Sequence, residues 1–242
     1  MTPYHPPVNI RCWIIGWAVT AGCAGPTSAI DPFRPNICLD TDVRFCNDFD
    51  LPTADQTPFG FKEFLGGDMT SVIVIAESGN RGLSVTSQGA AFGQTGATAV
   101  GSATSATVGA IIQPSQTAPG KALVVGLLLL DGSTPDGRQV WLVAQADGTL
   151  TVDSLGISLP TTGRLEAGAF SSVRIDATWV PGGNEILLDV AAGPPGEPLE
   201  LILEGHHIDL APVPQVSAAI AIISFEPGVR RFVFDDVTLD LQ

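Results

Sequence analysis

The stretch that decides the fold is VRIDATW, residues 173–179. Its odd-numbered positions are apolar and its even-numbered positions are polar, which is the period of a β-strand with one buried and one hydrated face. The same alternation recurs in three further runs, at residues 83–86, 150–153 and 186–190. Turn sequences separate these runs at Pro181-Gly182-Gly183-Asn184 and at Ala146-Asp147-Gly148, as expected of hairpins.

Two other segments complete the prediction of the fold class. Residues 122–130 are almost continuously apolar, which is consistent with a strand that is buried on both faces or partly covered by a loop. Residues 88–109 are rich in Gly, Ala, Ser and Thr and form either a loop or weak strands. No segment carries a 3.6-residue apolar stripe longer than about two turns. The sequence therefore predicts an all-β antiparallel sandwich.

The closing strand contains a change of phase. Phe232 and Phe234 set one apolar face, and Val237, Leu239 and Leu241 continue it. The step from 234 to 237 is three residues instead of two. One inserted residue, a β-bulge at Asp235-Asp236, is the simplest explanation.

Short motifs at both ends of the chain resemble a known family. FCNDFD at 45–50, SGNRGLSV at 78–85, the paired strands around Trp179 and FDDV at 234–237 occur in this order. Together they resemble a concanavalin A-like (laminin-G-like) jelly-roll domain of bacterial surface proteins, over residues 43–241. The resemblance implies two packed antiparallel sheets whose first and last strands are neighbours. A galactose-binding-like jelly roll has a similar ending and is the alternative fold.

A candidate calcium site follows from the neighbouring terminal strands. Four carboxylates would approach one another there, those of Asp48, Asp50, Asp235 and Asp236. A calcium ion with six to eight oxygen ligands would relieve their repulsion. The alternative is that these groups are solvated and pair with Arg44, Arg230 or Arg231. We favour this alternative, because no D-x-D-x-D-G spacing of a calcium loop is present. No other cofactor is indicated.

The N-terminus has the pattern of a bacterial lipoprotein signal peptide over residues 1–22. Arg11 precedes a short apolar run that ends in small residues and Cys23, and the run is about half as long as a membrane span. The sequence VTAGC at 19–23 resembles a lipobox, with Thr20 where Leu is commonest. We expect a diacylglycerol on Cys23, a tether over residues 23–36 and one jelly-roll domain over 37–242. The alternative is a secretory signal cleaved near Ala24.

Charge and cysteine content follow from removal of this leader. Arg11 is its one charged residue, so 10 basic and 25 acidic residues remain, a formal net charge of −15. Nucleic acid is thereby disfavoured as a partner, and any membrane contact should come from the lipid. Both interpretations of the leader predict an extracytoplasmic protein. In the lipoprotein case the lipid anchors it to a bacterial membrane, and we expect it at the outer membrane or the cell surface. Cys38 and Cys46 are then left as a pair, which we expect to form a disulfide.

Catalytic patterns are missing from the sequence. It contains neither the E-x-D-x-x-E of laminarinase-type glucanases nor a G-x-S-x-G. The only histidines after the leader are His206 and His207, which could share a zinc or copper ion only from a turn at Gly205. A solvated loop is the commoner setting for such residues. We therefore expect a protein that is not an enzyme.

Aromatic side chains give little direct sign of a sugar site. Trp179 and Phe232 are in apolar phase and are expected in the core, the orientation of Trp141 is open, and Phe170 is a candidate rim residue near a turn. We expect a noncatalytic module with a binding or surface-structural role, with a polysaccharide or an envelope protein as partner. A glycan-active enzyme, either a glycoside hydrolase or a polysaccharide lyase, is the alternative. No ligand-binding residue is assigned.

Overall fold

The structure is a computed structural model. It describes residues 45–47, 49, 62–64, 69–75, 81–87, 90–95, 97–114, 121–130, 138–154, 156–209, 213–224 and 228–242. These residues form strands, turns and connections and contain no helix, so none of them lies in a helix that could cross a membrane. Every pairing between the described strands is antiparallel.

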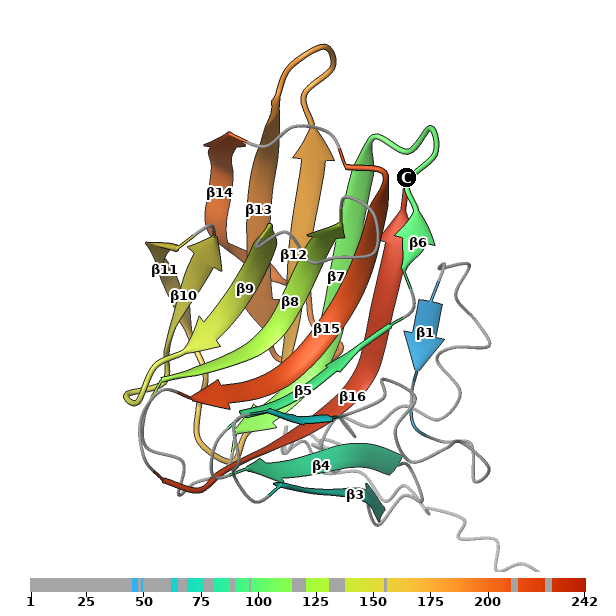
Figure 1. Ribbon diagram of the computed structural model, residues 1–242. Helices are drawn as coiled ribbons and strands as arrows, with labels where there is room; N and C mark the ends of the chain where they lie inside the picture. Colours follow the sequence, from blue (N-terminus) through green and yellow to red (C-terminus); the bar gives the residue numbers. More distant parts are fainter. Residues whose placement is uncertain are drawn as a thin grey trace, which may run out of the picture.

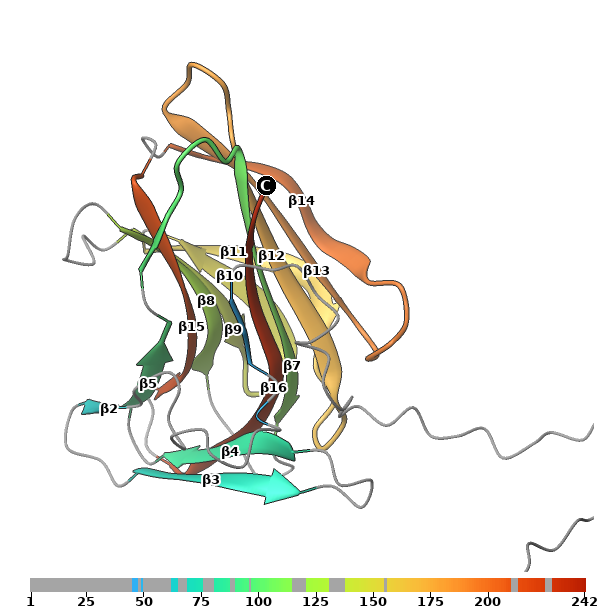
Figure 2. The same ribbon diagram turned by 90° about the vertical axis from the view of Figure 1, so that its right-hand side faces the viewer.

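The strands form two sheets that lie face to face (Figures 1 and 2). Sheet A has the order β14 (Glu200–Asp209), β13 (Glu185–Gly193), β12 (Ser171–Trp179), β7 (Ser105–Pro114), β16 (Arg230–Leu241), β4 (Arg81–Ser87) and β3 (Met69–Ile75), with β1 (Phe45–Asn47) also on β16. Sheet B has the order β11 (Ile157–Arg164), β10 (Thr149–Ser154), β9 (Gln139–Ala144), β8 (Ala122–Leu130), β15 (Gln215–Ser224), β5 (Ala90–Gln94) and β2 (Lys62–Phe64), with β6 (Thr98–Ala99) also on β15.

The deciding stretch forms β12 and has the predicted alternation. Val173, Ile175, Ala177 and Trp179 are buried, whereas Arg174 and the other even-numbered residues are exposed or half-buried. A turn at Pro181 to Asn184 connects β12 to β13, with Gly182 in the left-handed region at φ 72°. The turn at Ala146 to Gly148 connects β9 to β10 in the same way. Both hairpin predictions are confirmed.

The apolar run at 122–130 forms β8, which is buried on both faces as predicted. One face belongs to the main core between the sheets, where Leu127 and Leu142 of sheet B meet Ile175 and Phe234 of sheet A. The other face belongs to a second apolar cluster on the outer side of sheet B. The small-residue segment 88–109 supplies β5, β6 and the start of β7, so it contains strands.

The last strand, β16, holds sheet A together. Along one edge it pairs with β7, and along the other it pairs first with β4, at Arg230–Phe234, and then with β1, at Val237–Leu239. The predicted neighbourhood of the first and last strands is thereby confirmed (Figure 1). Between these two partners lies the bulge described below.

Candidate functional site

Several residues predicted from the sequence cannot be placed. Cys23, Cys38, Asp48 and Asp50 lie outside the described residues, as does the whole leader. Cys46 lies in β1 and is half-buried. The lipid anchor and the disulfide between Cys38 and Cys46 therefore stay predictions.

Asp235 and Asp236 form the predicted bulge in β16. Opposite β7, the three steps from Asp235 to Thr238 match only two on the partner strand. Asp236 is in the left-handed region at φ 47°, and its N–H donates to Oδ1 of Asp235 at 2.9 Å. Both side chains are buried, so the expectation that they are solvated is wrong for these two residues. Among the described residues no three metal-ligating side chains come together, so the calcium site stays a prediction.

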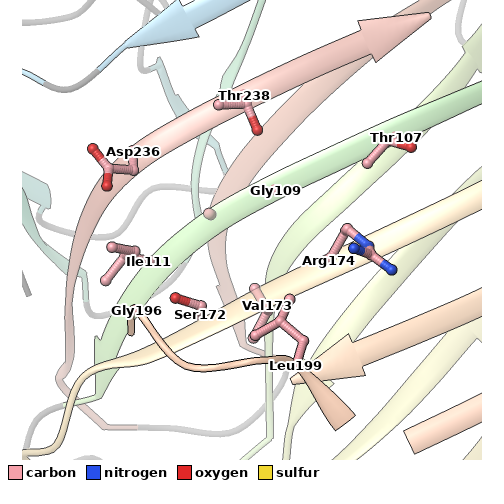
Figure 3. A pocket seen from close by; sticks show the side chains of 11 residues that line it. Thr107, Gly109, Ile111, Ser172, Val173, Arg174, Gly196, Leu199, Asp236 and Thr238 are labelled. Carbon is pink, nitrogen blue, oxygen red and sulfur yellow. The ribbon is translucent and has the colours of Figure 1, made fainter. Parts of the chain in front are cut away.

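Asp236 lines a shallow depression on the outer face of sheet A (Figure 3). The strands β7 and β12 form its floor, and Leu199 and Gly196 of the β13–β14 connection form one side. Arg174 lies across the depression from Asp236 (Figure 3) and bonds Asp176 through its Nε, 2.7 Å from Oδ2. The depression measures about 230 Å³, below the roughly 300–1,000 Å³ of most ligand pockets.

The outer face of sheet B is curved inward, as β15 and β8 show in Figure 2. Its centre is apolar and consists of buried residues from three strands: Leu128, Leu130, Trp141, Val143, Ala219 and Ala221. The indole of Trp141 lies against Gly126 and donates through Nε1 to Oε1 of Gln139 at 2.6 Å. The Asp153 carboxylate stands beside this cluster, opposite Trp141, and pairs with Lys121 at 3.6 Å. The described part of this concave face therefore carries a filled apolar centre.

Two larger cavities lie at one end of the sandwich. The first, about 420 Å³, lies between the β9–β10 turn and the β11–β12 connection. The second, about 430 Å³, lies between that connection and the ends of β13 and β14. Arg164 and Glu166 line both cavities. We call the two cavities together the end groove. Its polar, charged and aromatic lining residues are Gln145, Asp147, Thr162, Arg164, Glu166, Phe170, Ser171, Glu200 and Phe232.

Hydrogen bonds hold the walls of the end groove in place. The backbone N–H of Leu165 donates to the carbonyl of Gly148 at 2.8 Å, which joins the β11–β12 connection to the β9–β10 turn. The N–H of Gly168 donates to the carbonyl of Pro114 at 2.8 Å, and Nε2 of Gln113 donates to the carbonyl of Gly168 at 2.7 Å. These bonds come from three separate parts of the chain, so the groove is formed before any ligand arrives.

The charged groups of the end groove are exposed. Asp147, Arg164, Glu166 and Glu200 all lie at the surface. Hydrogen bonds from the backbone N–H and then the side chain of Thr149 lower the pKa of Asp147, and the charge of Arg164 acts in the same direction. Asp147 is thus an ionised hydrogen-bond acceptor at neutral pH. Phe170, half-buried beside these groups, adds an aromatic ring to the lining.

His206 and His207 are not brought together on a metal. A backbone irregularity at Gly205, with φ 56°, interrupts the pairing of β14 with β13. His207 Nδ1 lies 2.8 Å from Oε2 of Glu185, and both groups are exposed or half-buried. The two side chains are accessible to solvent as expected, but they lie in strand β14 and not in the loop that the sequence predicted.

No protein-family model matches the chain, and no curated protein matches its sequence. Solved structures match over most of its length. The cellulose induced protein Cip1 superimposes with a TM-score of 0.56 at 15% identity, covering 81% of this chain and 96% of that chain. The fold is a lectin-like jelly roll. The concanavalin A-like prediction is thereby confirmed.

Legume lectins are also among the similar structures. Lectin I-B4 from Griffonia simplicifolia gives a TM-score of 0.48 at 9% identity, covering 82% of this chain and 99% of that chain. Peanut lectin gives 0.49 at 9% identity, covering 82% and 97%. At these identities the likeness concerns the fold alone.

Sequence reasoning missed the end groove as a site. Glu166 belongs to no motif and Phe170 is predicted only as a rim residue, and nothing in the sequence joins either residue to Asp147. The sequence predicts only one wall of the groove, the turn at Ala146 to Gly148. The second wall comes from a connection about twenty residues later, and only the sheet order places the two side by side.

Proposed function

We propose that this chain is a noncatalytic carbohydrate-binding module, carried on a lipid-anchored protein of the bacterial envelope. The observation behind this proposal is the end groove: two adjoining cavities lined by carboxylate and guanidinium groups, hydroxyls and two aromatic rings, those of Phe170 and Phe232. Sugar hydroxyls need such acceptors and donors, and the apolar face of a pyranose needs a ring or aliphatic surface. The fold shared with Cip1, a protein named for its induction by cellulose, supports the same assignment.

One observation supports a noncatalytic role, and another excludes one candidate acid. A general acid for glycoside hydrolysis needs a raised pKa, whereas the pKa of Asp147 is lowered, so Asp147 is a poor candidate for that role. The centre of the concave face of sheet B is apolar and filled over the described residues, which favours a binding or structural module over a cleft enzyme.

A glycan-active enzyme remains the second candidate, and one observation favours it. Glu166 and Glu200 line the same cavity, and hydrolysis requires a pair of carboxylates. Release of reducing ends or unsaturated products from the polysaccharides that bind would support this candidate. Its test is loss of that release in Glu166→Gln and Glu200→Gln.

A polysaccharide screen of the purified full-length chain tests the binding proposal. We expect saturable binding to at least one glycan, and weaker binding by Glu166→Gln/Glu200→Gln. The matched control is Glu204→Gln, which removes an exposed carboxylate from the same strand as Glu200 but outside the end groove. A blank screen, or equal loss in the control, would overturn the proposal.

The screen is run with calcium and with chelator, because one of the two alternatives for Asp235 and Asp236, the one that the sequence favours less, is that they help to hold a structural calcium ion. In that case chelation lowers the unfolding temperature of the wild type, and Asp235→Asn removes this response. An unfolding temperature that is the same with calcium and with chelator would exclude the ion.

The envelope anchor is tested separately. Cys23→Ala should abolish labelling by a fatty-acid probe and release the protein from membranes, because the thiol that carries the diacylglycerol is lost. Cys46→Ala is the control for a general effect of cysteine loss, and it should keep the lipid label. Labelling that survives Cys23→Ala would refute the anchor.

A further inference from the structure

The end groove has an unbalanced charge. Three carboxylates line its two cavities, those of Asp147, Glu166 and Glu200, and Arg164 is the one cation among the described lining residues. Arg164 lines both cavities, and each cavity also contains two of the carboxylates, so the guanidinium is outnumbered in each. The formal charge of the whole chain is −14, which adds a repulsive background for any anion.

This charge decides among sugar polymers of similar shape. Uronic-acid or sulfated chains would bring anions against three carboxylates, which costs free energy at close range. Hydroxyls of neutral chains would also donate to the ionised carboxylates, but without the attraction between opposite charges. A chain of protonated amino sugars would donate charge-assisted hydrogen bonds to the carboxylates, and these are about twice as strong as neutral ones.

The spacing of the groups also suits a polymer. Glu166 is shared by both cavities, while Asp147 lines only the first and Glu200 only the second. A ligand that contacts all three carboxylates must therefore extend through both cavities, past Arg164. Hydroxyls or ring oxygens between successive amines would meet the guanidinium, which donates but cannot accept.

Building on the proposed carbohydrate-binding function, we infer that the end groove selects cationic amino-sugar polymers, of the glucosamine type, over neutral and anionic polysaccharides. The amine meets Asp147, Glu166 and Glu200, and the uncharged part of the sugar meets Arg164 and Phe170.

Titration calorimetry of the full-length chain tests this selection at about pH 6, where Asp and Glu are ionised. The probes are a glucosamine oligomer, its N-acetylated counterpart, an oligogalacturonate and a lysine oligomer of equal positive charge. We expect the glucosamine oligomer to bind most tightly, with an affinity that falls as salt screens the exposed charges.

Variants connect this preference to the groove. Glu166→Gln and Glu200→Gln should each weaken glucosamine-oligomer binding by about two- to fivefold, and should leave the weaker binding of the N-acetylated oligomer nearly unchanged. Glu204→Gln, with the same loss of charge outside the groove, should have no effect on either.

Each other outcome has a definite meaning. Equal binding of the acetylated or anionic oligomer would overturn the inferred selectivity while leaving carbohydrate binding intact. Equal binding of the lysine oligomer, or an equal effect of Glu204→Gln, would show attraction to the acidic protein in general and would also overturn it. Absence of binding to every saccharide would overturn the proposed function itself.

Discussion

Replacement of Gly126 on β8 by a larger residue is predicted to destabilise the fold, because the indole of Trp141 packs directly against this glycine. A Cβ at position 126 would stand 2.6 Å from Cε3 and 2.8 Å from Cδ2 and Cζ3 of the ring. Carbon atoms are in comfortable contact at about 3.5–4.0 Å, so the ring would have to retreat by roughly 1 Å. The ring has little space for this movement, because Trp141 is 4% exposed and its indole is hydrogen-bonded to Gln139.

The expected cost can be set from these contacts. Overpacking of a filled core typically costs about 1–3 kcal/mol, and we expect Gly126→Ala to lower the free energy of unfolding by about 2 kcal/mol. The assay is urea unfolding followed by circular dichroism. Gly193→Ala is the control, since an added Cβ there would meet its nearest neighbours at 3.4 Å or more, and we expect a change within about 0.5 kcal/mol.

A second background isolates the contact. Trp141→Ala alone should cost about 3–5 kcal/mol through the lost packing. In that background the further change Gly126→Ala should cost little, because the ring it would strike is gone. The reasoning is refuted if Gly126→Ala is as stable as the wild type, or if it costs as much without Trp141 as with it.

Two more predictions concern the bulge and the end groove. Deletion of Asp236 should turn the fully buried Val237 and Leu239 toward solvent and lower the free energy of unfolding by at least about 3 kcal/mol. The control Asp236→Gly keeps the register of the strand. Similar urea midpoints for the two variants would contradict the bulge. The lowered pKa of Asp147 stabilises the fold above its unfolded value of 3.8, and this contribution is lost as pH falls through the lower folded value. Asp147→Asn should therefore be less stable than wild type at neutral pH, and the difference should shrink as the pH falls below 3.8. Unfolding curves over this pH range measure the difference, and one that does not shrink in acid would contradict the prediction.

Local patterning was enough to predict the strands in which apolar and polar residues alternate, and the phase of those strands. The alternation of VRIDATW became the alternation of β12, because a half-buried strand has no other period. The three-residue step from Phe234 to Val237 located the bulge. Both residues are buried on the same face of β16, and this requires one extra residue between them. The neighbourhood of the first and last strands came from the family resemblance and not from any local signal.

The candidate site could not be predicted in this way. Asp147 and Glu200 are more than fifty residues apart in sequence, and neither interrupts a pattern, because exposed carboxylates at strand ends are common in any sandwich. Trp141 was ambiguous for a different reason: β9 is apolar on both faces, so alternation assigns no direction to its side chains. The convergence of connections at one end depends on sheet order, which a single sequence does not reveal.

The position of β16 within sheet A bears on how the chain is made and exported. This strand is the last of the described elements to be synthesised, yet β7, β4 and β1 all pair with it. Until residues 230–241 are available, β7 and β4 are open edges and the sheet cannot close. Such long-range pairing folds slowly, so sheet A is expected to close late in folding. If the leader is a secretory signal, as proposed, sheet A would still be open while the chain crosses the membrane.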